Sequence, residues 1–324
     1  MPRVETIVTS LTWTLCLLVP LFGPGQATAA EEAPGEPQPY VVVLGIAQDG
    51  GYPQAGTKES PAWDDPSLRR LVSCLAVVDP ATSQRWLLDA TPDFREQLHR
   101  LDQLAPVPER PGLAGIFLTH GHIGHYTGLI HLGREVMGTH QVPVYAMPRM
   151  AEFLRTNGPW NQLVRLENIS LQPLRAGEPV RLNARLSITP LLVPHRDEYT
   201  ETVGLRIDGP RRSVLFIPDI DKWEHWDEQG QRVEEAIAGV DVAFLDGTFF
   251  ADGELPGRDL SKIPHPVITR TMKRFAELPA AEKQKVRFIH LNGTNPALDP
   301  RSEAHKTIED AGFGVARELE KVPL

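Results

Sequence analysis

Three histidines within six residues, placed at the end of an apolar segment, constrain this chain more than any other feature. The segment "LAGIFLTH" (113–120) is typical of a buried strand and leads into "THGHIGH", which holds His120, His122 and His125. Residues two apart in extended backbone point to the same side, so His120 and His122 can share one ion. Imidazole binds zinc, iron, nickel and copper. The pattern therefore predicts a metal site and disfavours the alternative of three solvated loop histidines.

A single loop offers too few ligands for a metal ion, so partners are expected at the ends of other strands. Sites in α/β folds lie at the C-terminal ends of strands. Four more apolar segments end in suitable residues, namely "SITPLLVPH" at His195, "SVLFIPD" at Asp219, "DVAFLD" at Asp246 and "VRFIH" at His290. An aspartate in such a place is often only a turn or helix cap, so the set carries more weight than any member. The predicted metal ligands are His120, His122, His125, His195, Asp219 and His290.

The order of the predicted elements indicates two packed sheets. A β hairpin over 74–90 is followed by alternating helices and strands, including a predicted helix over 126–137. Residues 163–217 are rich in strands, and 232–312 alternate between helix and strand again. Two sheets packed face to face with helices outside explain this order, whereas one doubly wound sheet needs no central hairpins.

The N-terminus has the pattern of a secretory signal peptide. Arg3 precedes the apolar run "LTWTLCLLVPLFG", and the small residues "ATAA" follow it. A membrane anchor is the alternative, but the run is short and is interrupted by proline and glycine. We therefore expect a signal peptide over 1–29, a linker over 30–39 and a folded domain over 40–324. The protein would be exported to the periplasm or the medium, with no stable membrane anchor after cleavage.

Composition limits the classes of partner. The 324 residues carry a formal net charge of −9, and no run of lysine and arginine stands out. This distribution lacks the basic footprint of a nucleic-acid-binding protein. We expect a small-molecule substrate and no nucleic-acid partner, and no pattern sets the oligomeric state.

The histidine motif with its later partners resembles the metallo-β-lactamase superfamily, whose pattern is T-H-x-H-x-D-H, a single histidine, a bridging aspartate and a final histidine. Here these positions fall on "THGHIGH", His195, Asp219 and His290. The resemblance covers roughly residues 40–300 and implies an α/β fold, the four-layer αββα sandwich. Within the superfamily, "AQDGGYPQ", "TPDFREQL" and "HLNGTNPALD" are similar to segments of the B protein of pyrroloquinoline quinone biosynthesis and its relatives.

The chain also departs from both patterns. Gly124 stands where the superfamily has an aspartate that binds the second metal or handles protons. Three other carboxylates could replace it, those of Asp49, Asp93 and Asp246. The B protein lacks part of the histidine set at the position of His122, so this chain keeps more of the hydrolase ligands. The resemblance thus implies one or two ions, with the second site in question.

These observations favour a metal-dependent hydrolase that uses a metal-activated water on an ester, lactone or phosphodiester. Zn²⁺ is the expected cofactor, with Fe or Mn as alternatives. Asp219 would be the catalytic residue, bridging the ions or orienting the water. Two other functions stay open. One is a non-haem-iron oxidoreductase related to pyrroloquinoline quinone biosynthesis, and the other is a non-catalytic small-molecule-binding module. His265, at the start of a predicted helix, could line the pocket.

Overall fold

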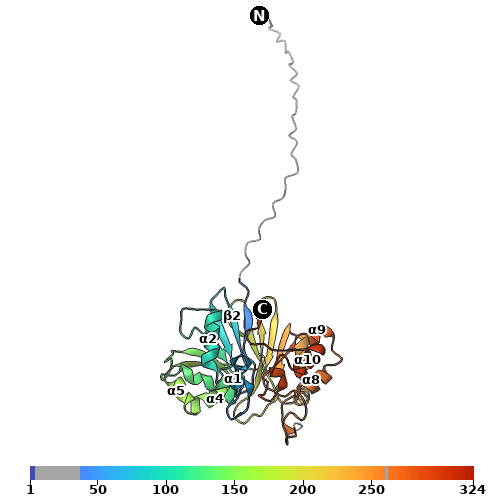
Figure 1. Ribbon diagram of the computed structural model, residues 1–324. Helices are drawn as coiled ribbons and strands as arrows, with labels where there is room; N and C mark the ends of the chain where they lie inside the picture. Colours follow the sequence, from blue (N-terminus) through green and yellow to red (C-terminus); the bar gives the residue numbers. More distant parts are fainter. Residues whose placement is uncertain (4–36, 260–261) are drawn as a thin grey trace. The chain divides into compact units, whose positions relative to one another are not determined.

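Two seven-stranded sheets form the centre of the computed structural model, which describes residues 1–3, 37–259 and 262–324 (Figure 1). Residues 37–324 make one compact unit. The predicted signal peptide beyond residue 3 and the linker as far as residue 36 lie outside the described residues. Those two predictions, and export, therefore stay predictions.

The first sheet has the strand order β14-β1-β2-β3-β4-β5-β6. The predicted hairpin is confirmed as the antiparallel pair β2–β3, with Leu75 opposite Leu88, and the strands from β3 to β6 run parallel. The strands are β1 (Tyr40–Gly45), β2 (Cys74–Asp79), β3 (Gln84–Leu88), β4 (Gly115–Phe117), β5 (Val142–Ala146), β6 (Ile169–Pro173) and β14 (Lys321–Pro323).

The second sheet has the order β13-β12-β11-β10-β9-β8-β7. Strands β7 to β10 form the predicted central hairpins, and β10 to β13 run parallel. The strands are β7 (Val180–Arg181), β8 (Ser187–Leu192), β9 (Val203–Asp208), β10 (Ser213–Ile217), β11 (Val242–Asp246), β12 (Val286–Ile289) and β13 (Gly314–Val315).

Helices cover the outer face of each sheet. Figure 1 shows α2, α4 and α5 on one side of the paired sheets and α8, α9 and α10 on the other, so the αββα sandwich is confirmed. The helices are α1 (Pro61–Asp64), α2 (Phe94–Leu104), α3 (Ile123–Tyr126), α4 (Pro148–Thr156), α5 (Trp160–Arg165), α6 (Trp223–Glu228), α7 (Val233–Ala238), α8 (Ile268–Arg274), α9 (Ala280–Lys283) and α10 (Glu303–Asp310). Within the described residues, no helix is both long and apolar enough to cross a membrane.

The sequence of strand β1 is apolar without interruption because both faces of the strand are buried. Val41 and Val43 belong to the core between the two sheets, whereas Val42 and Leu44 belong to the core under the outer helices. Successive side chains of a strand point to opposite faces, so a strand covered on both faces needs apolar residues throughout. The two cores hold the strands in place, and with them the loops that follow the strand ends.

The predicted helix over 126–137 is wrong. Helix α3 is one turn long, and a 3-10 helix over Thr127–Leu132 follows it. The loop after β3 takes hydrogen-bonding groups that a regular helix would use within itself. The N–H of Ala90 donates to the carbonyl of His125 at 2.9 Å, and the carbonyl of Ala90 accepts from the N–H of Gly128 at 2.8 Å. These long-range hydrogen bonds prevent a regular helix and fix His125 against the first sheet.

Candidate metal centre

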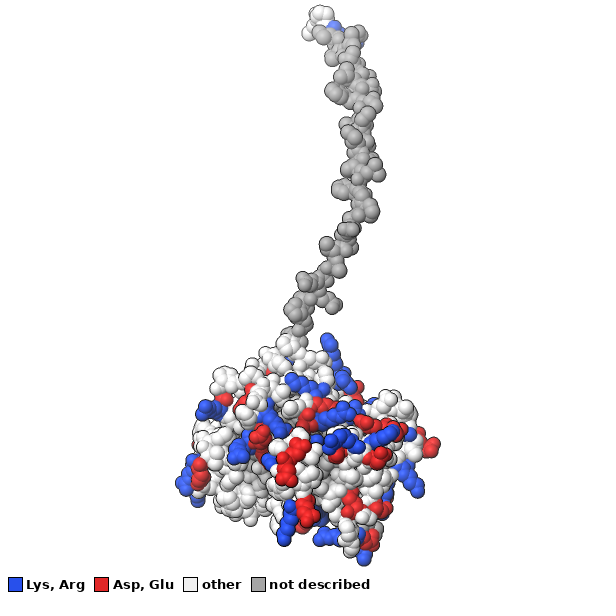
Figure 2. Space-filling model, in the orientation of Figure 1, with Lys and Arg blue, Asp and Glu red and all other residues white. Residues whose placement is uncertain are grey.

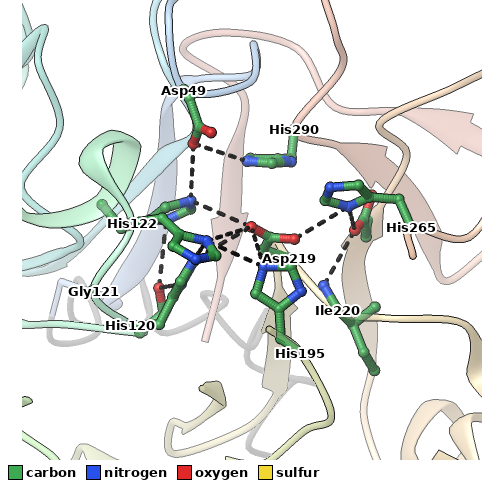
Figure 3. A network of polar contacts seen from close by, with 12 residues as sticks. Asp49, His120, Gly121, His122, His195, Asp219, Ile220, His265 and His290 are labelled. Atoms are coloured by element: carbon green, nitrogen blue, oxygen red, sulfur yellow. Dashed lines mark hydrogen bonds and ion pairs between the residues drawn. The ribbon is translucent and has the colours of Figure 1, made fainter. Parts of the chain in front are cut away.

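The six predicted ligands converge at one end of the paired sheets. His120, His122 and His125 follow β4, His195 follows β8, Asp219 follows β10 and His290 follows β12. Figure 3 shows the side chains of His120, His122, His195 and His290 turned toward a common centre, with Asp219 in the middle. The groups that could hold an ion include two further carboxylates and one further histidine, namely Asp49, Asp246 and His265.

His120, His122, His195 and Asp219 form the first group. Nδ1 of His122 lies 2.9 Å from Nε2 of His120 and 3.2 Å from Nε2 of His195. Oδ2 of Asp219 lies 3.3, 3.2 and 4.0 Å from those nitrogens of His120, His195 and His122. Ligands about 2.0–2.1 Å from a tetrahedral zinc ion are about 3.3–3.4 Å apart, so the spacing of this group fits such an ion.

Asp49, His125 and His290 form the second group. Oδ1 of Asp49 lies 3.4 Å from Nε2 of His125 and 3.6 Å from Nε2 of His290. All three atoms are buried, and none makes a hydrogen bond within the described part of the chain. Asp219 Oδ2 lies 3.9 Å from His125 Nε2, so this aspartate borders both groups. Buried polar atoms without partners are costly, and a cation among them would satisfy all three.

The third group connects Asp219 to His265 and Asp246. Nδ1 of His265 lies 3.2 Å from Oδ1 of Asp219 and 2.9 Å from Oδ2 of Asp246. Burial alone would lower the pKa of His265, but these two carboxylates outweigh it and raise the pKa well above the ordinary value. The two carboxylates thus favour the protonated form of His265 beside the other two groups.

The outer nitrogen of each predicted histidine ligand contacts a protein oxygen. Such contacts set the ring orientation and tautomer of metal-binding histidines. The five contacts are His120 Nδ1 with Thr119 Oγ1 at 3.0 Å, His122 Nε2 with Glu198 Oε2 at 3.1 Å, His125 Nδ1 with Asp89 Oδ2 at 2.7 Å, His195 Nδ1 with Asp221 Oδ1 at 3.0 Å and His290 Nδ1 with Thr248 Oγ1 at 3.1 Å.

The two central carboxylates stay ionised although they are buried. Burial alone would raise the pKa of Asp219, but His265, His195 and the other imidazoles hold it well below its usual range. Burial likewise opposes ionisation of Asp49, and the imidazoles of His125 and His290 hold its pKa far below the ordinary value. The centre thus offers anionic oxygens and imidazole nitrogens together, which suits a divalent cation.

Two residues of the centre have a left-handed backbone conformation, which residues other than glycine rarely adopt. Asp89 has φ of 72° and His290 has φ of 64°. Asp89 is held there because its carboxylate accepts from the backbone N–H and hydroxyl of Thr119 as well as contacting His125. Such strain persists where surrounding contacts enforce it, commonly at functional sites.

The ligands of the first two groups differ in how far solvent reaches them. The side chains of His120, His125, His195, Asp219 and His290 are 0–2% exposed. His122 and Asp49 are 14% and 28% exposed, so these two side chains are the parts of the two groups that solvent reaches most.

The three carboxylates that could replace the aspartate missing at position 124 have different surroundings in the structure. Asp49 lies in the second group, whereas Asp246 contacts His265. Asp93 accepts a hydrogen bond from the backbone N–H of Val72 at 2.9 Å and belongs to none of the three groups. Asp89 and Glu198 were not anticipated, although Asp89 follows an apolar strand and so carried the same signal as Asp219.

The fold and this centre define a class, and sequence comparison agrees. The family model described as "Beta-lactamase superfamily domain" matches residues 84–291, and the chain belongs to that family. Its relatives within the family are coenzyme PQQ synthesis B proteins. The protein of Xanthomonas campestris pv. campestris (strain B100) is 30% identical over 308 residues, which cover 86% of this chain and 97% of the relative.

Solved structures give the same result. Zinc-bound PqqB from Methylobacterium extorquens superposes with a TM-score of 0.73 at 25% identity, covering 88% of this chain and 100% of that one. A diphosphatase from the PhnP family superposes with a TM-score of 0.62 at 21% identity, covering 89% and 98%. The second likeness is one of fold alone.

Proposed function

We propose that this protein is a zinc-dependent hydrolase that acts on a small ester, lactone or phosphodiester. The observation that carries the proposal is the first group, in which three imidazole nitrogens have the spacing of zinc ligands and the carboxylate of Asp219 lies beside them, at the border with the second group. Three histidine ligands leave a position for water, as in catalytic zinc sites. The zinc-bound relative supports zinc as the metal.

His120, His122, His195 and Asp219 would hold the first ion, and His125 and His290 would contribute to a second. A bound zinc ion acts as a Lewis acid on a substrate oxygen and lowers the pKa of water to about 7. Asp219 borders both groups and is the one carboxylate able to bind or orient groups between them. It is therefore the proposed catalytic residue.

His265 would act through Asp219. Its Nδ1 lies between Oδ1 of Asp219 and Oδ2 of Asp246, so the ring fixes the orientation of the Asp219 carboxylate. Asp246 is held in turn by the hydroxyl of Thr248 at 2.7 Å and by the backbone N–H of Ile220 at 3.2 Å. This chain of contacts limits rotation of the group that both metal sites share.

The burial of the centre supports a small substrate. Five of the six predicted ligands are almost completely covered, and a buried centre of this kind favours a compact reacting group. Figure 2 shows basic and acidic side chains interspersed over the visible face of the domain, without a wide basic surface there. A neutral or singly charged small molecule fits these features better than a polyanion.

The test is hydrolysis of p-nitrophenyl acetate, bis(p-nitrophenyl) phosphate and dihydrocoumarin by zinc-loaded protein. We expect at least one substrate to be turned over, and His122→Ala to lose both zinc and turnover. His140→Ala, in an exposed residue outside the centre, is the matched control. Unchanged turnover by metal-free His122→Ala protein would refute the hydrolase, and no turnover by any zinc-loaded protein would favour a binding module.

A second function is favoured by the sequence relatives. Those relatives are named for coenzyme PQQ synthesis, and histidines with a carboxylate also suit non-haem iron. In that case the protein would be an iron-dependent oxidoreductase acting on a quinone precursor or modified peptide. Iron content after expression in iron-rich medium, together with oxygen consumption, distinguishes it from the zinc hydrolase.

Export is a separate proposal that rests on residues 1–29 alone. N-terminal sequencing of protein recovered from the periplasm and the medium tests it. A mature chain beginning near residue 30 is the expected result, and full-length protein confined to the cytoplasm would contradict it.

A further inference from the structure

The side chain of Asp49 fills the space that a side chain at position 124 would need. A Cβ atom placed on Gly124 would lie 2.1 Å from Oδ1, 2.7 Å from Cα and 2.9 Å from Cγ of Asp49. Real Cβ atoms do not approach other atoms so closely. Gly124 lies in the helical turn α3, whose backbone any L-residue can adopt, so backbone conformation does not require the glycine. The close approach of Asp49 is what requires a glycine at position 124.

Backbone pairing delivers Asp49 to this place. Ala47 forms an isolated bridge with Leu291, and Gln48 N donates to Leu291 O at 2.8 Å. The side chain of Gln48 also accepts a hydrogen bond from that of Asn292. The loop after β1 is therefore fastened to the residues that follow His290. Figure 3 shows the result, with the Asp49 carboxylate facing the His290 ring.

We propose that Asp49 is the carboxylate ligand of a second metal ion, in the role that an aspartate at position 124 has in the superfamily motif. The ligand has moved to another segment of the chain, and side chains at 49 and 124 exclude each other. Two fully buried nitrogens without hydrogen bonds, Nε2 of His125 and Nε2 of His290, face the same oxygen of Asp49. The inference rests on the proposed function only in taking the centre to bind metal.

The proposal predicts a reciprocal exchange. Asp49→Gly should leave one zinc ion per chain. Gly124→Asp should also lose the second ion, because the side chains at 49 and 124 collide and neither carboxylate can then take its ligand position. The double variant Asp49→Gly/Gly124→Asp should restore two ions per chain. The matched control Asp49→Gly/Gly124→Ala relieves the same clash but supplies no carboxylate, so it should hold one. Zinc per chain is measured by mass spectrometry after desalting, and cobalt absorption reports each site.

The outcomes separate this inference from the proposed function. Two tightly held ions in Asp49→Gly, or in the conservative Asp49→Asn, would overturn the relocation of the ligand while leaving a metal hydrolase in place. A wild-type protein that binds no metal at all would overturn the proposed function instead. If Gly124→Asp does not fold, Asp49→Asn and the two double variants still decide the matter. Asp93→Asn, in a carboxylate outside the groups, should keep two ions.

Discussion

Nδ1 of His125 lies 2.7 Å from Oδ2 of Asp89, and neither side chain is exposed to solvent. A carboxylate behind a histidine ligand fixes its ring and strengthens its metal binding. Burial alone would lower the pKa of His125, but Asp89 and Asp49 raise it to about 10. Asp89 would therefore orient a ligand of the proposed second metal site although it does not face that site.

We expect Asp89→Asn to weaken binding of the second ion by about 10–100-fold, because the amide keeps the shape but loses the charge. Competition with a chromophoric chelator measures the affinity. Circular dichroism establishes that the variant is folded, and Asp93→Asn is the control. Wild-type affinity in folded Asp89→Asn protein would show that this carboxylate serves only the fold.

Removal of metal should lower the melting temperature. A ligand that binds only the folded state stabilises that state by about 2.7 kcal/mol per site when its free concentration is 100 times its Kd. Treatment with EDTA should therefore lower the melting temperature by about 5 °C or more, since about 1 kcal/mol corresponds to roughly 2–4 °C in a chain of this size. Added zinc should reverse the change. Equal melting curves before and after EDTA, with metal loss verified, would argue against ions in the centre.

His265→Gln should lower turnover by about 10–100-fold while zinc content stays the same, because glutamine carries no charge to pair with the carboxylates of Asp219 and Asp246. The effect should appear in kcat rather than in KM, since the residue orients Asp219 and lies behind it. His140→Gln is the control. Loss of zinc together with activity would mean that His265 supports binding of the metal.

Stability should depend on pH through Asp79, which joins the two sheets. Its carboxylate, at the end of β2, accepts from the side chains of Asn183 and Arg185, in the segment between β7 and β8. Burial opposes ionisation, but Arg185 and Asn183 lower the pKa below its ordinary value. The folded state thus binds a proton less readily than the unfolded chain, so this stabilisation is complete above about pH 4 and is lost at lower pH.

We expect Asp79→Asn to reduce the free energy of unfolding by about 2 kcal/mol at pH 7. The difference from wild type should shrink as the pH falls below about 4, where Asp79 of the unfolded wild-type chain becomes protonated, and should vanish at a lower pH, where the folded carboxylate is protonated too. Urea unfolding at several pH values measures it, with exposed Asp64→Asn as the control. A difference that is constant with pH would contradict the assignment.

The sequence predicted the arrangement of the fold because its signals are local. The apolar run "YVVVLG" and the hairpin β2–β3 can be recognised from side-chain periodicity and turns. Local patterns could not show that the predicted helix over 126–137 is wrong. What shortened it were hydrogen bonds from the loop around Ala90, which is distant in sequence.

The sequence by itself determined which imidazoles are available, because three histidines at one strand end and further ligands at other strand ends are a local pattern. It also determined that position 124 offers no carboxylate. Only the tertiary structure decided which of Asp49, Asp93 and Asp246 lies beside that position. Pairing of Ala47 with Leu291 brings Asp49 beside His290, and this proximity depends on how two strands far apart in the chain pack, which no local pattern encodes.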